Sequence, residues 1–191
     1  LAVAVNANGT LDITDKANGK EFRGLGYFKD SGEIGNPWEH VPPQNDTVFT
    51  TLNAQADVSL IRDGELEVSY RVKIDWALPA GRSQDERNRS DALKPYPIII
   101  TVTLRKRQRW VEVITELDNT AEDHYLQVSF PTNIPAEHVM AQGQFDVIRR
   151  PVAKPDYALY DEIPMTEQPM NSFVDLSDGQ VGLALLNEGL K

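Results

Sequence analysis

Hydrophobic and polar residues alternate with a period of two along most of this chain. In residues 66–76 (LEVSYRVKIDW) the apolar and the charged side chains fall on opposite faces of an extended strand. Residues 97–106, 109–117 and 124–131 alternate in the same way and are rich in β-branched and aromatic residues, which suit a pleated surface. The pattern predicts long antiparallel strands, each with one buried face and one solvated face.

Asn-Gly and Asp-Gly pairs separate the predicted strands at residues 8–9, 18–19, 63–64 and 178–179. Such pairs supply the positive φ angles that tight hairpin turns require. No window shows a helical period with caps, and we expect the mostly charged residues 83–93 to form an exposed loop. The sequence therefore predicts an all-β fold, a large antiparallel β-sandwich.

The proline-rich part of the chain, residues 134–169, interrupts this regular pattern. Proline cannot donate a hydrogen bond to a sheet ladder, so we expect strands there to be short or to lie at a sheet edge. The chain ends directly after an apolar strand, and we expect the sandwich to be incomplete at its C-terminus and to continue beyond Lys191. Residues 1–191 are predicted to be one domain, a fragment of a larger protein.

Composition narrows the classes of function. The 191 residues are 40% hydrophobic, which is enough for a core, and the net charge is -10. Nucleic acids and anionic membranes bind basic surfaces, so neither is expected as a partner. The chain has no cysteine, which excludes thiol nucleophiles and thiolate metal sites. Its longest apolar runs are far shorter than the roughly 20 residues that span a bilayer.

Few residues suggest catalytic chemistry. None of His40, His124 and His138 pairs with a second ligand at helical spacing, so we predict no metal site. His124 and His138 each follow an acidic residue, and we interpret both as surface histidines. A Gly-x-Ser-x-Gly elbow, a Walker loop and a complete dinucleotide fingerprint are all missing from the sequence. We therefore assign no catalytic residue and expect no cofactor in these 191 residues.

The loop at residues 35–46 (GNPWEHVPPQND) combines an aromatic residue with several polar ones. Sugar rings have apolar C–H faces and polar edges, so sugar sites use such a combination. Alternatively, Trp38 fills the edge of the core and the prolines only stiffen the loop, and the residues alone favour this interpretation. The candidate residues are Gly35, Asn36, Trp38, Glu39 and His40.

Four longer segments carry a resemblance to a known family, and FVDLSDGQVGLALLNEG in the last of them is the most specific string. In these segments the chain resembles the C-terminal β-sandwich region of bacterial family 38 glycoside hydrolases, the α-mannosidases, whose relatives include mannosylglycerate hydrolases. The segments are NGTLDITDKANGKEFRGLGYFKDSGEIGNPWEHVPP (8–43), RWVEVITELDNTAEDHYLQVSFPT (109–132), FDVIRRPV (145–152) and EQPMNSFVDLSDGQVGLALLNEGLK (167–191).

The resemblance implies a supersandwich like that of galactose mutarotase. Such a region packs on a catalytic domain and lends residues to the rim of its active site. The family pattern of a glycine followed by an aromatic residue falls on Gly35 and Trp38, although relatives more often have Tyr after an acidic residue where this chain has Pro37 and Trp38. The five candidate residues above are therefore expected at the substrate rim or at the interdomain contact.

The same resemblance implies that the catalytic machinery lies elsewhere. Family members cleave α-mannosidic bonds with retention, using a zinc ion and an Asp nucleophile in an N-terminal α/β domain. We therefore expect an accessory domain that is inactive alone. Its partners would be the rest of the same polypeptide and an α-mannoside or mannosylglycerate-type sugar. A bacterial cytoplasm is the favoured compartment.

Two alternative functions remain open. A free-standing carbohydrate-binding module would use Trp38 and its polar neighbours. A mutarotase-like sugar enzyme would need a histidine acid and a carboxylate base facing one groove, with His40 as the histidine. An accessory domain should instead expose an apolar patch that includes Trp38, Val41 and the prolines at 42 and 43.

Overall fold

The computed structural model describes residues 1–35, 39–153, 156, 158 and 167–188. The chain divides into two compact units, Leu1–Pro131 (unit 1) and Thr132–Lys191 (unit 2). No α-helix occurs in the described residues, and all pairings between their strands are antiparallel. The predicted all-β antiparallel fold is confirmed.

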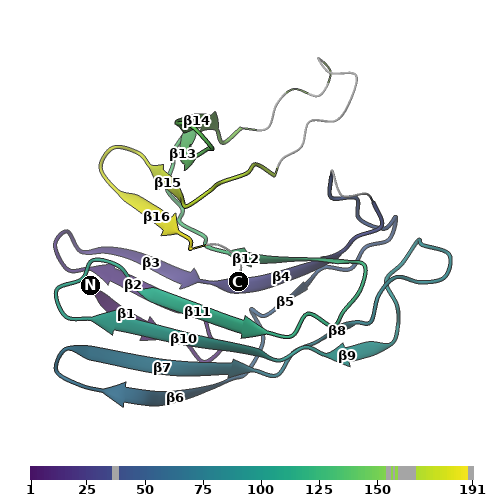
Figure 1. Ribbon diagram of the computed structural model, residues 1–191, viewed down its shortest axis with the longest axis horizontal. Helices are drawn as coiled ribbons and strands as arrows, with labels where there is room; N and C mark the ends of the chain where they lie inside the picture. The colour runs from purple at the N-terminus through teal and green to yellow at the C-terminus, as the bar shows by residue number, and fades with distance from the viewer. Residues whose placement is uncertain (36–38, 154–155, 157, 159–166, 189–191) are drawn as a thin grey trace. The chain divides into compact units, whose positions relative to one another are not determined.

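The four-stranded sheet of unit 1, at the bottom of the view in Figure 1, contains the strands whose sequences alternate most clearly. Its register places Ile74 between Ala56 and Ile98 on neighbouring strands, and all three side chains are buried. In β7 the alternate residues on the opposite face, Glu67, Ser69, Arg71 and Lys73, are charged or hydroxylated, as the period of two predicts. The strand order is β11 (Glu112–Leu117), β10 (Ile98–Arg105), β7 (Glu67–Ile74), β6 (Ala56–Asp63).

The second layer of unit 1 is built from shorter strands. A Cβ atom at Gly9, in the first hairpin, would lie 3.0 Å from side-chain atoms of both Val72 and Ile74, so this hairpin packs directly on β7. Leu25 and Phe28 complete the buried core on this side. The strands are β1 (Ala2–Val5), β2 (Leu11–Asp15) and β3 (Lys20–Leu25), then β4 (Tyr27–Gly32), β5 (Phe49–Thr50) and β12 (His124–Ser129).

Two of these strands determine where the polar side chains described below are placed. β4 lies between β12 and β5, and its register sets His124 of β12 opposite Gly32. A separate short pair, β8 (Ala77–Pro79) with β9 (Leu93–Pro95), carries the loop at residues 80–92. As predicted from its charges, that loop is mostly exposed.

The predicted turns are found where expected. Gly9, Gly19 and Gly179 have φ angles of 85°, 74° and 88°, which glycine adopts without steric cost. Gly64 also lies between two paired strands, β6 and β7, although its φ angle is not positive. The hairpins at all four positions are therefore confirmed.

The described residues of unit 2 form one four-stranded sheet. Its strands have five residues each, and β14 lies at an edge, in keeping with the proline content of this region. The order is β14 (Val147–Pro151), β13 (His138–Gln142), β15 (Phe173–Ser177), β16 (Gly182–Leu186).

Candidate functional site

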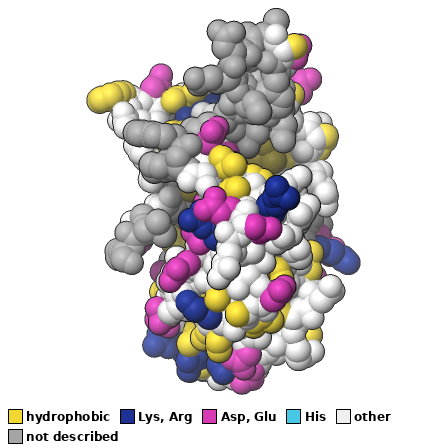
Figure 2. All heavy atoms as spheres, turned by 90° about the vertical axis from the view of Figure 1, so that its right-hand side faces the viewer, with side chains coloured by type: hydrophobic (Ala, Val, Ile, Leu, Met, Phe, Trp, Pro, Cys, Tyr) yellow, Lys and Arg dark blue, Asp and Glu magenta, His cyan; other side chains and the backbone are white. Residues whose placement is uncertain are grey.

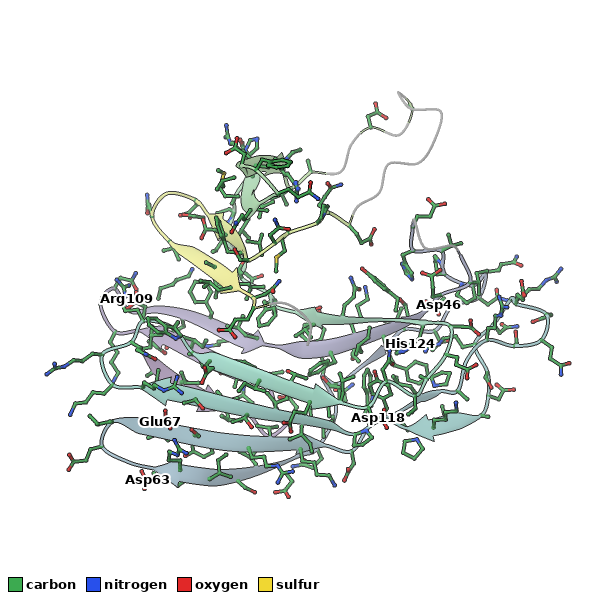
Figure 3. The ribbon with its side chains drawn as sticks, viewed as in Figure 1. Asp46, Asp63, Glu67, Arg109, Asp118 and His124 are labelled. Carbon is green, nitrogen blue, oxygen red and sulfur yellow. The ribbon has the colours of Figure 1, made fainter. Side chains whose placement is uncertain are left out.

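Three loops of unit 1 come together at one end of the sandwich, which we name the loop end. Asp46, Asp118 and His124 are labelled at this end in Figure 3. Backbone hydrogen bonds join the loops, including Asn45 N to the carbonyl of Arg87 at 2.9 Å. The loops are the β4–β5 loop (33–48, described at 33–35 and 39–48), the β8–β9 loop (80–92) and the β11–β12 loop (118–123).

A buried carboxylate lies at the centre of the loop end. The side chain of Asp30, in β4, is fully buried, and each of its oxygens has a nitrogen partner. Arg89 Nη2 donates to Oδ1, and His124 Nδ1 lies 2.5 Å from Oδ2. The side chains of Arg89 and His124 are only 4% and 5% exposed. A charge so removed from water is tolerated only with such partners, because desolvation is costly.

The network continues from His124 to a buried phenol. His124 Nε2 lies 2.7 Å from Asn119 Oδ1, and the Tyr96 hydroxyl donates to the same oxygen at 2.9 Å. Burial, then the charges of Asp30 and Asp118, raise the pKa of Tyr96 to about 12. The phenol is therefore neutral at physiological pH and acts as a hydrogen-bond donor.

Arg89 contacts both strand β4 and the end of the β4–β5 loop. Its Nη1 donates to the backbone carbonyl of Asp30 at 3.4 Å and to that of Thr47 at 3.3 Å. The guanidinium also lies 5.3 Å from the ring centroid of Phe49, within cation–π range. Arg89 Nε is buried and has no acceptor among the described residues. One side chain thus connects the strand before the loop with the residues that end it.

The narrow part of the β4–β5 loop is closed by a carboxylate and a backbone bond. Glu33 Oε1 accepts the N–H groups of Gly35 at 2.6 Å and Val41 at 3.2 Å. Ile34 N donates to the carbonyl of Val41 at 2.9 Å. A Cβ atom at Gly35 would lie only 2.6 Å from Val41 Cγ2. The close approach of the two sides of the loop therefore requires glycine here.

His40 is held against the strands below the loop. Its Nε2 lies 3.2 Å from Ser31 Oγ and 3.0 Å from the carbonyl oxygen of Gly32. Its ring stacks on Tyr125 of β12, with centroids 4.4 Å apart and planes inclined by 27°. Gly32 N in turn donates to Asp46 Oδ1 at 2.9 Å. His40 therefore has a defined place although it lies in a loop.

The structure places three of the five predicted site residues. Gly35 and Glu39 are exposed and His40 is partly buried, whereas Asn36 and Trp38 lie outside the described residues. The predicted apolar patch is likewise untested at Trp38, and of its prolines Pro42 is exposed and Pro43 is buried. Figure 2 faces the loop end and shows acidic, basic and hydrophobic side chains interspersed.

The interpretation of His124 as a surface histidine was wrong, because its side chain is buried against Asp30. Sequence reasoning also missed Asp30 and Arg89. The alternation carries a signal for Asp30 and for His124, but none for Arg89. Asp30 shares its strand face with buried Phe28, and His124 shares its face with Leu126. A charged residue in an apolar register indicates a buried partner.

The described residues do not provide a metal centre. Across residues 1–35, 39–153, 156, 158 and 167–188, no group of three or more His, Cys, Asp or Glu side chains could hold a metal ion. The zinc that the family resemblance implies therefore finds no ligand set in this part of the chain. In the same residues, no helix is long and apolar enough to cross a membrane.

Comparisons with known proteins give matches over nearly the whole chain. The sequence model of the protein family described as "Glycosyl hydrolases family 38 C-terminal domain" matches residues 1–190. A protein of Halalkalibacterium halodurans named "Putative mannosylglycerate hydrolase" is 24% identical over 204 residues, which is 100% of this chain and 22% of that protein.

Solved structures from Enterococcus faecalis agree with the sequence comparison. An alpha-mannosidase of strain V583 superimposes with a TM-score of 0.85 at 29% identity, covering 97% of this chain and 22% of its own. A protein in the glycosyl hydrolase family 38 gives a TM-score of 0.87 at 28% identity, with 97% and 23% covered. The chain therefore spans about a fifth of the length of these relatives.

Proposed function

Because the chain belongs to the family of C-terminal domains of family 38 glycosyl hydrolases, we propose that it is the accessory domain of a longer α-mannosidase-type enzyme. In this proposal residues 1–191 act as one domain that packs on a zinc-dependent catalytic domain of the same polypeptide. The substrate is an α-mannoside or a mannosylglycerate-type sugar, and the enzyme works in a bacterial cytoplasm. The chain alone is inactive.

One observation carries the proposal. The family model matches nearly the whole chain, whereas the chain covers only about a fifth of each relative, so most of each relative lies outside the shared region. Glycoside hydrolysis generally needs two carboxyl groups that flank the scissile bond. At the loop end, the carboxylate of Asp30 is hydrogen-bonded to Arg89 and His124. The carboxylate of Glu33 accepts backbone N–H groups.

We further propose that the loop end is the side of the domain that faces the catalytic domain. Contacts between domains of one chain are more polar than permanent interfaces, and the mixed surface in Figure 2 suits such a contact. Gly35, Glu39 and His40, together with Asn36 and Trp38, would then lie at the substrate rim or at the interdomain contact. The closed neck of the β4–β5 loop supports this role, since a preformed loop loses less entropy on docking.

The test uses the α-mannosidase of Enterococcus faecalis as host. We expect no α-mannoside turnover by the 191-residue chain with added zinc. Deleting the matched region from the host should abolish its activity, and inserting this chain in its place should restore it. The assay is run on α-mannosides and on mannosylglycerate, so that it also identifies the preferred sugar. Turnover by the isolated chain at the rate of the intact host would refute the proposal.

A further inference from the structure

The β4–β5 loop is supported by a side chain that belongs to another loop. Arg89 lies 59 residues from Asp30 and 42 residues from Thr47 along the sequence, yet it binds both. Asp30 lies in the strand that leads into the loop, and Thr47 lies where the loop ends. The guanidinium therefore fixes the separation between the two sides of the loop.

We infer that Arg89 is a positioning residue for the β4–β5 loop and sets the place of His40. The biological meaning of this inference rests on the proposed function, in which this loop faces the catalytic domain. The geometric claim itself concerns only unit 1, and it can be tested without any enzyme activity.

The contacts of Arg89 require an arginine. The side chain supplies a positive charge to a carboxylate, an N–H donor to two carbonyls, and a flat face to the Phe49 ring. Lysine carries a compact ammonium on a flexible stem and cannot make these contacts together. The Arg89 side chain is only 4% exposed, so these contacts are made away from water.

The position of Arg89 is transmitted to His40 by two routes. Along β4, Asp30 is followed by Ser31 and Gly32, whose oxygens lie next to His40 Nε2. Across the sheet, Asp30 binds His124, and the next residue, Tyr125, stacks on the His40 ring. A shift of Asp30 therefore disturbs two of the supports of His40, whose Nε2 also lies 3.9 Å from Glu33 Oε2.

Arg82 provides a matched control from the same β8–β9 loop. It pairs with Glu86 at 3.1 Å and with Asp123 at 3.5 Å, and its side chain is 39% exposed. Neither partner belongs to the β4–β5 loop. An Arg82→Lys substitution should therefore leave the loop unchanged, whereas Arg89→Lys should release it.

The experiment is nuclear magnetic resonance on the complete 191-residue chain. The sequence has three histidines, so the ring signals of His40 can be assigned by substituting each histidine in turn. Stacking on Tyr125 shifts the His40 ring protons away from the values of a free histidine. Hydrogen exchange of the Gly35 and Val41 amides, which donate to Glu33, reports on the closed neck of the loop.

We expect Arg89→Lys to move the His40 ring signals toward free-histidine values and to speed exchange at Val41 by about tenfold or more, since charged hydrogen bonds are lost. Arg82→Lys should change neither. A role limited to stability would lower the denaturation midpoint of Arg89→Lys while the native His40 signals stayed in place. That result would overturn the inference, as would equal effects of the two substitutions.

Two further measurements apply if Arg89→Lys does not fold. In the unsubstituted chain, the Val41 amide should exchange much more slowly than a free amide, and unprotected exchange would overturn the inference. Phe49→Leu removes only the ring beneath Arg89 and should shift the His40 signals part of the way; unchanged signals would also count against it. These measurements do not depend on enzyme activity. A failure of the replacement assay in the Enterococcus faecalis enzyme would therefore count against the proposed function and not against the role of Arg89.

Discussion

Substitution of Asp30 by Asn tests how strongly the buried charge network stabilises unit 1. Asn keeps the shape of Asp, but one of its two side-chain oxygens is replaced by an NH2 group, which then faces the nitrogen of either Arg89 or His124. The substitution also leaves the Arg89 cation without its counter-charge. Breaking a buried ion pair in this way costs about 3–5 kcal/mol. The free energy of unfolding falls by about 2 kcal/mol per M urea, so the urea concentration at the unfolding midpoint should decrease by about 2 M.

The assay is urea unfolding followed by tryptophan fluorescence. All three tryptophans, Trp38, Trp76 and Trp110, belong to unit 1, so the signal reports on that unit alone. Asp123→Asn is the matched control, because Asp123 is 37% exposed and pairs with Arg82 at 3.5 Å. Exposed pairs contribute about 0–1 kcal/mol. A loss for Asp30→Asn no larger than that for Asp123→Asn would refute the reasoning.

Three other predictions concern the loop and its surroundings. Gly35→Ala forces a Cβ atom against Val41 and should destabilise the loop by about 1–3 kcal/mol, seen as faster exchange of the Val41 amide; Gly81→Ala, where the φ angle is not positive and a Cβ would come no closer than 3.4 Å to another atom, should leave that amide unchanged. Because the pKa of Tyr96 is raised from 10.0 to about 12, the stability it contributes is complete below pH 10 and is lost as the pH rises through 12; Tyr96→Phe should flatten the fall of the urea midpoint over this range, and an unchanged profile would contradict the assignment. Calorimetry of the isolated chain with mannose oligosaccharides should detect no binding tighter than about millimolar, and tight binding abolished by Trp38→Ala would favour a carbohydrate-binding module instead.

The strands could be predicted from the sequence because their side chains alternate between core and solvent. Residues 66–76 and 97–106 contain β7 and β10, and Gly64 lies between β6 and β7 as expected. The division into two compact units at Pro131 could not be predicted in this way. A period of two shows which face of a strand is buried, but it carries no information about which sheet that strand joins.

The site could be predicted only in part. The composition of the β4–β5 loop predicted a site there. In the structure Gly35 belongs to the closed neck of the loop, and His40 contacts Gly32 at the end of β4. The network beneath it was missed because its members lie far apart in the sequence, so that the positions of Asp30 and His124 within their strands do not reveal their partners. Arg89 lies in a run of charged residues that reads as an exposed loop, and only the tertiary structure shows its burial.

The long sequence separations at the loop end have a consequence for the order of folding during synthesis. Arg89 follows Asp30 by 59 residues and His124 follows it by 94. A nascent chain that has not yet reached β12 can give the carboxylate only one of its two nitrogen partners. Since contacts between distant residues form slowly, this end of the sandwich should be the last part of unit 1 to become rigid on the ribosome.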